Sequence, residues 1–357
     1  MIRKSTLSLN FSNKGKLKIL DDLIIEYNQL VNKFIDYLWT NNLTTGKFVS
    51  NCKQFNNLTF LSARLVQCVA KQALQICKSQ NKKKKKTKPE FKKLVVELDE
   101  RFFELFQNFN SFDFWFKLKS LYCRVNNKNN KITKIFFPSK KHKHFNDLIK
   151  DNFELKKSCR IRKTDKGFFL DIFFEKEDVP KRTKGRKIGI DIGYKKICVS
   201  SDGYCFGKEI EKICNKISKK KRNSKSYKRS LVERTEYINK TSKQLFEFYQ
   251  NIKEIKIENL KNVKHQSKFS HRFNNKLQYW SYSKFINRIK MTSEINGVQI
   301  SKVNPAYTSQ TCSFCNKNNK LSRNNEIFEC VYCGKILDSD HNAALNIFMK
   351  PRSNRSI

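Results

Sequence analysis

The sequence predicts a multidomain α+β protein, and three observations support this class. Hydrophobic residues recur at helical spacing from residue 17 to about 80, and strand-like alternation takes over between 91 and 178. After residue 184, three consecutive strands are followed by alternating helices and strands. Near the C-terminus, four cysteines form two tight pairs, which is typical of a small metal-bound module.

The composition indicates a polyanionic partner. The 357 residues include 75 Lys and Arg but only 32 Asp and Glu, so the net charge is +43. Self-repulsion from such an excess would destabilise an enzyme for small metabolites, and nucleic acid is the leading candidate for the partner. Codon bias could explain part of the lysine content, but it would not hold down the number of acids. Hydrophobic residues make up 38 %, which excludes a disordered basic tail.

Targeting signals are missing from the sequence. No hydrophobic run approaches the roughly 20 residues of a membrane span, and residues 1–17 lack the apolar segment of a signal peptide. We therefore expect an intracellular protein with no membrane partner, cytoplasmic and nucleoid-associated if the host is prokaryotic. Eight of the twelve cysteines stand singly and are interpreted as small buried residues, because the length and the missing signal argue against a disulfide framework.

The N-terminal half predicts a β-rich domain interrupted by helices. Residues 5–11 alternate like a strand, and the segments 18–40 and 59–79 have helical spacing. The lysine run at 82–86 is equally consistent with a solvated linker and with a nucleic-acid contact. The clearest strands form a hairpin over 159–176, with its turn at Asp165-Lys166-Gly167. We expect these strands to form a small barrel or sheet with the N-terminal strand.

The C-terminal half predicts a ribonuclease H architecture. Strands between 187 and 206 are separated by turns at Gly193-Tyr194 and Asp202-Gly203. A long basic helix is expected at about 210–249, then a strand at 254–260. A helix, another strand and a closing helix that carries an acid complete the order of elements.

Three acids stand out against this pattern. Asp191 lies centrally in an apolar strand, and Glu258 lies at the C-terminal end of another, which is where sites form in sheets with helical crossovers. Asp340 shares the helical spacing of Ala343, Ala344 and Ile347, so it lies on the face that packs inward. Each acid alone is ambiguous, since an acid on the open face or at the end of a strand would give the same pattern.

Together, the three acids could bind two divalent cations. Carboxylates are the hard oxygen ligands that hold Mg²⁺ or Mn²⁺ about 4 Å apart in two-metal phosphodiester cleavage. One ion would activate water and the other would stabilise the leaving oxygen. Because the acids are far apart in the sequence, only the tertiary fold could bring them together.

The paired cysteines predict one structural Zn²⁺. Cys312 and Cys315 form the first pair and Cys330 and Cys333 the second, with 14 residues between the pairs. Four thiolates close a tetrahedral coordination sphere, so this metal would do no chemistry. Two chance pairs are improbable at this spacing, and a redox role would need only one pair.

The segments Gly189-Ile-Asp-Ile-Gly193, Ile255-Lys-Ile-Glu-Asn-Leu260, Tyr307-Thr-Ser-Gln-Thr-Cys312 and Asp338-Ser-Asp-His-Asn-Ala-Ala-Leu-Asn-Ile347 carry a specific resemblance. With the cysteine pairs, they resemble the three RuvC motifs and the zinc ribbon of TnpB, the transposon-associated RNA-guided nucleases related to compact type V CRISPR effectors and eukaryotic Fanzor proteins. These motifs cover about 185–348. One departure is Asn316, where the family usually has Gly, but Asn also tolerates the left-handed conformation needed there.

The resemblance implies a domain organisation. We expect a β-rich wedge domain with an inserted helical recognition lobe, a RuvC-like nuclease domain and a zinc ribbon. Their bounds are 1–16 plus 90–180 for the wedge domain, 17–89 for the recognition lobe, 184–304 plus 336–350 for the nuclease domain, 305–335 for the zinc ribbon insert and 351–357 for a tail.

The resemblance also implies a function. The chain would be an RNA-guided DNA endonuclease that cuts next to a short target-adjacent motif, with Asp191, Glu258 and Asp340 as the catalytic metal ligands. Its partners would be a guide RNA and target double-stranded DNA, and it would act as a monomer with RNA. The alternatives are a CRISPR effector of the same mechanism, a nuclease acting without RNA, and a binding protein such as a repressor without cleavage.

The sequence further separates two neighbouring aspartates. If the last helix begins at Ser339, Asp338 takes the N-cap position and its carboxylate accepts from the backbone N–H of His341. Asp340 then lies in the first turn, where the positive end of the helix favours an anion.

Overall fold

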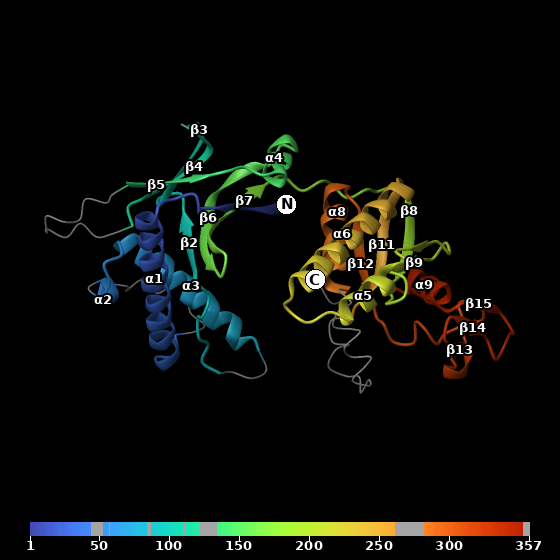
Figure 1. Cartoon of the computed structure of the whole chain (residues 1–357). Helices are drawn as coiled ribbons and strands as arrows, with labels where there is room; N and C mark the ends of the chain where they lie inside the picture. The colour runs from blue at the N-terminus through green and yellow to red at the C-terminus, as the bar shows by residue number, and fades with distance from the viewer. Residues whose placement is uncertain are drawn as a thin grey trace, which may run out of the picture. The chain divides into compact units, whose positions relative to one another are not determined.

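The computed structural model describes residues 1–43, 53–56, 58–83, 87–109, 111–121, 134–260 and 282–352. The chain forms two compact units, Met1–Glu177 and Asp178–Ile357. The first is coloured blue to green in Figure 1 and the second yellow-green to red. Within the described ranges, no helix has the length and hydrophobicity to cross a membrane.

The N-terminal unit is built on antiparallel strands. A four-stranded sheet has the order β1-β7-β6-β2, and a three-stranded sheet has the order β3-β4-β5. The first strand pairs with β7 from Ile2 opposite Glu175 to Ser8 opposite Phe169, so the start of the chain completes a sheet made of much later residues, as expected. The strands are β1 (Ile2–Ser8), β2 (Val95–Asp99), β3 (Phe103–Phe109), β4 (Phe112–Lys119), β5 (Lys134–Ser139), β6 (Glu154–Thr164) and β7 (Gly167–Glu175).

The predicted hairpin is present as β6 and β7, and it explains why the first strand ends early. Gly167 begins β7 with a φ of +107°, and the side chain of Asn10 occupies the space that a Cβ would need. Asn10 accepts from the backbone N–H of Phe168 at 2.8 Å and donates to the carbonyl of Lys166 at 2.9 Å. The strand expected at 5–11 therefore spans Ile2–Ser8 instead, because Asn10 already belongs to this turn.

Two long helices pack against each other in the same unit. The first begins after Asn13, whose side chain accepts from the backbone N–H of Lys16 at 2.9 Å. Its buried residues recur at helical spacing, as in Leu20, Leu23 and Tyr27. The expected linker residues 84–86 lie outside the described part of the chain. The helices are α1 (Lys14–Thr40), α2 (Lys53–Asn56), α3 (Ala63–Asn81) and α4 (Lys143–Lys150).

The C-terminal unit contains a five-stranded sheet with the order β10-β9-β8-β11-β12. Strands β8, β9 and β10 pair antiparallel, whereas β11 lies parallel to both β8 and β12. Three meandering strands followed by two parallel ones are the ribonuclease H-like arrangement that the sequence predicts. The strands are β8 (Arg186–Asp191), β9 (Cys198–Ser200), β10 (Cys205–Phe206), β11 (Ile252–Glu258) and β12 (Gln299–Val303).

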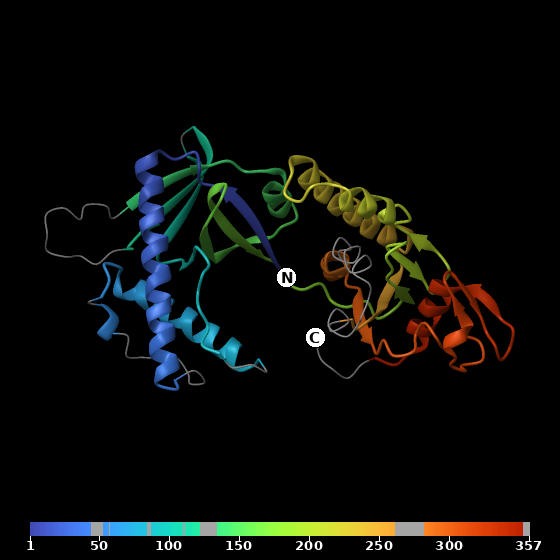
Figure 2. The ribbon, with the colours of Figure 1, turned by 60° about the horizontal axis from the view of Figure 1, so that its bottom comes forward.

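Helices cover both faces of this sheet (Figure 2). On one face, α5 (Ile210–Ser218), α6 (Lys225–Phe248) and α8 (Tyr282–Ile295) enclose a core that includes Ile188 and Ile190 of β8. The last helix, α9 (Ser339–Met349), contacts β8, β9 and β11 from the other face. Because alternate strand residues face opposite ways, Gly189 and Asp191 point toward α9.

The single long helix expected at 210–249 is wrong. The chain forms α5 and α6 instead, with a break at residues 219–224. Asn223 adopts a left-handed φ of 64°, which ends helical propagation. Ser224 then caps α6 by accepting from the backbone N–H of Tyr227 at 3.1 Å.

A small sheet lies beside the cysteine pairs: the first pair precedes its first strand, and the second pair lies in the turn before its last strand. It has the order β13-β14-β15, with antiparallel pairing throughout. The strands are β13 (Arg323–Asn324), β14 (Ile327–Glu329) and β15 (Ile336–Asp338). The last strand runs directly into α9, so this module and the large sheet are joined through one continuous segment.

Candidate active site and metal centre

Asp191 is the last residue of β8, so its expected central place in the strand is wrong: the chain leaves the sheet at Ile192. The strand holds it in place because Ile188 and Ile190 are fully buried in the core on the opposite face. Burial raises the pKa of the Asp191 carboxyl to about 8, and the carboxylates of Glu258 and Asp340 contribute to the shift. With these neighbours and no bound cation, the Asp191 carboxyl would hold a proton at neutral pH.

Glu258 ends β11, the parallel neighbour of β8. Parallel strands place their C-terminal ends at the same edge of a sheet, so Glu258 and Asp191 lie near one another. The hydroxyl of Thr308 donates to the Glu258 carboxylate, and the hydroxyl of Tyr282 donates to the Glu258 carbonyl at 3.1 Å. Burial raises the pKa of Glu258 despite the hydrogen bond from Thr308.

Asp340 lies in the first turn of α9. The carboxylate of Asp338 caps this helix, accepting from the backbone N–H groups of Asp340 and His341, each at 3.0 Å. The predicted N-cap is therefore confirmed. Burial raises the pKa of Asp340, so its carboxyl, like those of Asp191 and Glu258, resists ionisation when no cation is bound.

Gly189 lets α9 approach the sheet. A Cβ at this position would lie 2.4 Å from the carbonyl oxygen of Ala344 and 2.5 Å from the backbone nitrogen of Phe348. Both atoms belong to the backbone of α9, so the helix rests directly on β8. This contact sets the distance between the sheet that carries Asp191 and the helix that carries Asp340.

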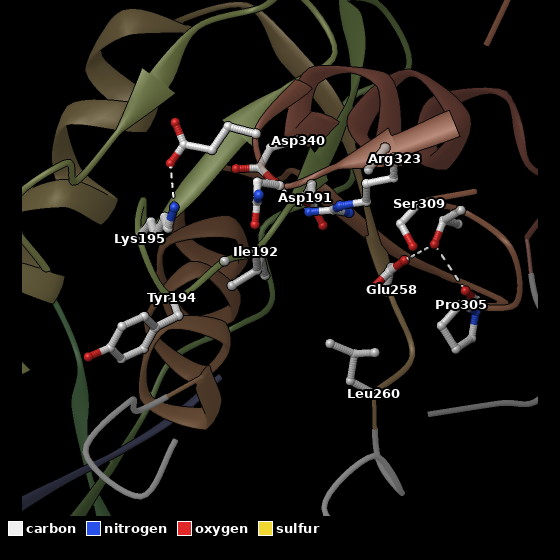
Figure 3. Close-up of a pocket in the computed structure, with 15 residues that line it drawn as sticks. Asp191, Ile192, Tyr194, Lys195, Glu258, Leu260, Pro305, Ser309, Arg323 and Asp340 are labelled. Atoms are coloured by element: carbon white, nitrogen blue, oxygen red, sulfur yellow. Dashed lines mark hydrogen bonds and ion pairs between the residues drawn. The ribbon is translucent and has the colours of Figure 1, made fainter. Parts of the chain in front are cut away.

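The three acids line one cavity of about 860 Å³ (Figure 3). Its wall is completed by residues from the loop after β8, from the segment after β12 and from the small sheet, including Lys195, Pro305, Ser309, Arg323 and Glu326. The structure therefore brings together all three acids singled out in the sequence.

The sequence analysis missed two basic side chains that lie near Asp340. Arg323 Nη2 lies 3.2 Å from Asp340 Oδ1, and Lys196 Nζ lies 3.9 Å from Asp340 Oδ2. Lys196 also pairs with Asp338 at 2.8 Å. Nothing local marks Arg323, which comes from β13 and reaches the cavity only through the fold. Thr308 was also overlooked, although it lies in the Tyr307–Cys312 segment that carries the resemblance.

The donor set of the cavity fits hard divalent cations. Three desolvated carboxylates converge, and each has a raised pKa. Burying such groups together is costly unless positive charge compensates them. Arg323 lowers the pKa of all three acids, yet burial outweighs its effect and each pKa stays raised. Carboxylate oxygens are the ligands that Mg²⁺ and Mn²⁺ prefer.

The four paired cysteines form a second candidate metal site. The sulfurs of Cys312, Cys315, Cys330 and Cys333 all lie within 4.8 Å of one another. The Sγ–Sγ distance is 3.8 Å between Cys312 and Cys333 and 3.6 Å between Cys315 and Cys330. Four sulfurs about 2.3 Å from a tetrahedral Zn²⁺ would lie about 3.8 Å apart, so the cluster fits zinc. Asn316 has a φ of 60°, which agrees with the conformation expected at this departure from the family pattern.

Comparison with known proteins identifies relatives of this chain. Residues 282–347 match the family model described as Cas12f1-like, TNB domain. A TnpB-like protein of Methanocaldococcus jannaschii is 31 % identical over 154 residues, which cover 41 % of this chain and 54 % of that protein. The chain is thus similar to TnpB-like and Cas12f proteins over part of its length.

Further relatives support this relationship. The CRISPR-associated endodeoxyribonuclease Cas12f1 of an uncultured archaeon is 29 % identical over 211 residues, covering 48 % of this chain and 40 % of that protein. The chain thus spans about half the length or less of these two TnpB-like and Cas12f relatives. A solved Cas12f1–sgRNA–target DNA complex matches 94 % of this chain and 83 % of the Cas12f1 chain with a TM-score of 0.61. At 17 % identity, that likeness shows the shared fold alone.

Proposed function

We propose that this chain is an RNA-guided DNA endonuclease that cleaves target DNA next to a short target-adjacent motif. The observation that supports this most directly is the cavity in which Asp191, Glu258 and Asp340 meet at one edge of a ribonuclease H-like sheet. The relationship to TnpB-like and Cas12f proteins supports the guide RNA and the DNA substrate.

In this proposal, the three acids hold two Mg²⁺ or Mn²⁺ ions. When bound, such a pair of ions activates a water molecule and stabilises the leaving oxygen of the phosphodiester. The chain's own contribution is to orient the ligands: the Thr308 hydroxyl fixes the Glu258 carboxylate, and the cap formed by Asp338 fixes the first turn that carries Asp340. The guanidinium of Arg323 presents a planar donor that can bind a phosphate oxygen beside the acids.

The four cysteines would hold one structural zinc ion. Zinc would fix the small sheet, and that sheet supplies Arg323 to the cavity and leads through β15 into α9. The zinc site would thus act on cleavage only through the position of these elements.

The charge of the chain suits its proposed partners. A net charge of +43 favours binding to the phosphates of a guide RNA and of a target duplex. Base pairing between the guide and the target would carry most of the sequence specificity, so the protein needs to recognise charge and shape rather than bases. We propose that it acts as a monomer with its RNA.

The test measures target cleavage by the purified protein, which carries its co-purified RNA. The same assay is run on variants of residues that line the cavity. Glu258→Gln keeps the size of the side chain but removes the charge, so cleavage of a target plasmid in Mg²⁺ should be lost while nucleic-acid binding persists. Glu329→Gln is a matched control, because Glu329 is an exposed acid on β14 and should be dispensable.

Three outcomes would contradict parts of the proposal. Cleavage by Glu258→Gln at the parent rate would mean that the metal ligands are misassigned. Target cleavage that survives removal of the RNA would indicate a nuclease that acts without a guide. Stable binding without cleavage in either Mg²⁺ or Mn²⁺ would indicate a binding protein.

A further inference from the structure

Two lysines tie the end of α9 to the rest of the C-terminal unit. The first, Lys256, lies on β11 two residues before Glu258. Its Nζ donates to the carbonyls of Phe348 at 2.7 Å and of Lys350 at 2.8 Å. The last carbonyls of an α-helix have no partners within the helix, so an ammonium group in this place satisfies them. The end of α9 is thus held on the strand that carries Glu258.

The second lysine, Lys350, directly follows α9 and makes another bridge. Its Nζ donates to the carbonyl of Asn304 at 3.1 Å and to the carbonyl of Ala306. These two residues flank Pro305, which lines the cavity together with Glu258 (Figure 3). Lys350 therefore holds the chain on both sides of one residue of the cavity wall.

The turn after β12 brings Thr308 to Glu258. Thr308 is buried, and its hydroxyl donates to the Glu258 carboxylate. Its Oγ1 also lies 2.9 Å from the carbonyl oxygen of Pro305, and the backbone N–H of Ala306 donates to Asn304 Oδ1 at 3.0 Å. Because the turn is short and internally hydrogen-bonded, the position of its first residues sets the position of Thr308.

These contacts form a closed ring that starts and ends on β11. From Lys256 the ring passes through the end of α9 to Lys350. It continues through the turn after β12 to Thr308 and returns to β11 at Glu258. Lys256 and Glu258 are two residues apart on the strand, so they lie on the same face of the sheet. The ring restricts Glu258, because moving its carboxylate requires several hydrogen bonds to break together.

Lys350 also places a positive charge near the acids. Burial raises the pKa of Glu258, and the hydrogen bond from Thr308 and the charge of Lys350 oppose that shift. The same charge would repel a divalent cation held by Glu258. The charge and the hydrogen bonds of Lys350 thus have opposite effects on metal binding: loss of the charge would strengthen it, and loss of the hydrogen bonds would weaken it.

We propose that Lys350 is a positioning residue of the three-acid site and that it acts on Glu258 through the turn after β12 and Thr308. Lys256 supports this role by holding the end of α9. Lys350 itself does not line the cavity, so its hydrogen bonds act on the metal site indirectly. The proposal rests on the proposed function, because it takes Glu258 to be a metal ligand.

The test measures metal binding separately from cleavage. Mn²⁺ is titrated into the full chain freed of RNA, since RNA phosphates bind Mn²⁺ themselves, and the free ion is followed by electron paramagnetic resonance. Glu258→Gln identifies the part of the binding that belongs to the three acids. Lys350→Met removes the ammonium group from a side chain of similar length and should weaken that part about tenfold, as the loss of an outer partner of a metal ligand does. Lys350→Arg should restore the affinity, because a guanidinium can still donate to two carbonyls.

A double-mutant cycle shows whether the effect passes through Thr308. Thr308→Val removes the hydroxyl and should weaken Mn²⁺ binding by itself. Adding Lys350→Met to Thr308→Val should then change the affinity little, because both substitutions break the same chain of contacts. Lys212→Met is the matched control, since the side chain of Lys212 is 79 % exposed on α5 and its loss should leave Mn²⁺ binding unchanged.

Single-turnover cleavage by the RNA-loaded protein supplies a second readout. Lys350→Met should need about tenfold more Mg²⁺ than the parent to reach half of its maximal rate. Lys350→Arg and Lys212→Met should show the parent's dependence on Mg²⁺.

Mn²⁺ binding by a folded Lys350→Met protein that equals or exceeds the parent's affinity overturns the proposal. Additive effects in the cycle overturn it too, as does a lowered melting temperature with unchanged metal affinity, which would indicate a purely structural role. Lys350→Gln replaces Lys350→Met in every measurement if Lys350→Met does not fold. Failure of the proposed function would appear differently, as Mn²⁺ binding by the parent that Glu258→Gln leaves unchanged.

Discussion

Replacing Gly189 by alanine tests whether the contact between β8 and α9 sets the geometry of the acid cluster. The added Cβ would lie 2.4 Å from a carbonyl oxygen and 2.5 Å from a backbone nitrogen of α9. Since neither atom belongs to a flexible side chain, the helix must withdraw by about 1 Å to reach ordinary van der Waals contact. Asp340 lies on that helix and would move with it.

Two magnitudes follow from this displacement. Overpacking of a well-packed contact costs about 1–3 kcal/mol, which would lower the melting temperature of the C-terminal unit by several degrees. A misplacement of about 1 Å at a catalytic group can reduce the rate about 100-fold. We therefore expect Gly189→Ala to lose much more activity than stability.

The assay is single-turnover cleavage of one target, combined with thermal unfolding of the same preparations. Gly15→Ala is the control, because Gly15 lies in the first turn of α1 and a Cβ there would be 3.7 Å from Asn13 Oδ1, an ordinary van der Waals contact. It should cleave at the parent rate. A Gly189→Ala protein with the parent's cleavage rate and melting temperature would refute the argument that this contact positions Asp340.

Three further predictions concern the acids and the cysteines. Cys330→Ser should lose the zinc ion, as measured by metal analysis, and should expose the segment 305–348 to proteolysis; a variant that keeps full zinc content would contradict the ligand assignment. Asp338→Ala should cost only about 1 kcal/mol of stability and keep much of the single-turnover cleavage, whereas Asp340→Asn should abolish cleavage without unfolding; the reverse result would mean that the other aspartate is the ligand. When no Mg²⁺ or Mn²⁺ is added, burial and the nearby carboxylates of Glu258 and Asp340 hold the pKa of Asp191 at about 8, while the unfolded chain releases this proton near pH 4. Because the folded state binds the extra proton, the free energy of unfolding should fall as the pH rises from about 4 to 8, and melting curves of Asp191→Asn should show a flatter dependence.

Local signals in the sequence determined several features of the protein. The spacing of the cysteine pairs predicts the cluster, because two ligands separated by two residues can reach one metal ion through a single turn of the chain. The cap at Asp338 and the turn at Gly167 were predicted for the same reason: each depends on residues within a few positions. The break in the helix expected at 210–249 was also encoded locally, by Asn223 and Ser224, but the helical spacing on both sides obscured it.

Tertiary structure alone decided how the acids meet and what surrounds them. Asp191 and Glu258 approach one another because β8 and β11 are parallel neighbours, a pairing that no short segment specifies. Asp340 joins them because α9 crosses β8 at Gly189, where the absence of a Cβ admits the helix backbone. Arg323 reaches Asp340 only after the small sheet has folded. Such contacts join residues far apart in the chain, and their energies depend on distances and burial that exist only once the sheet and its helices have packed.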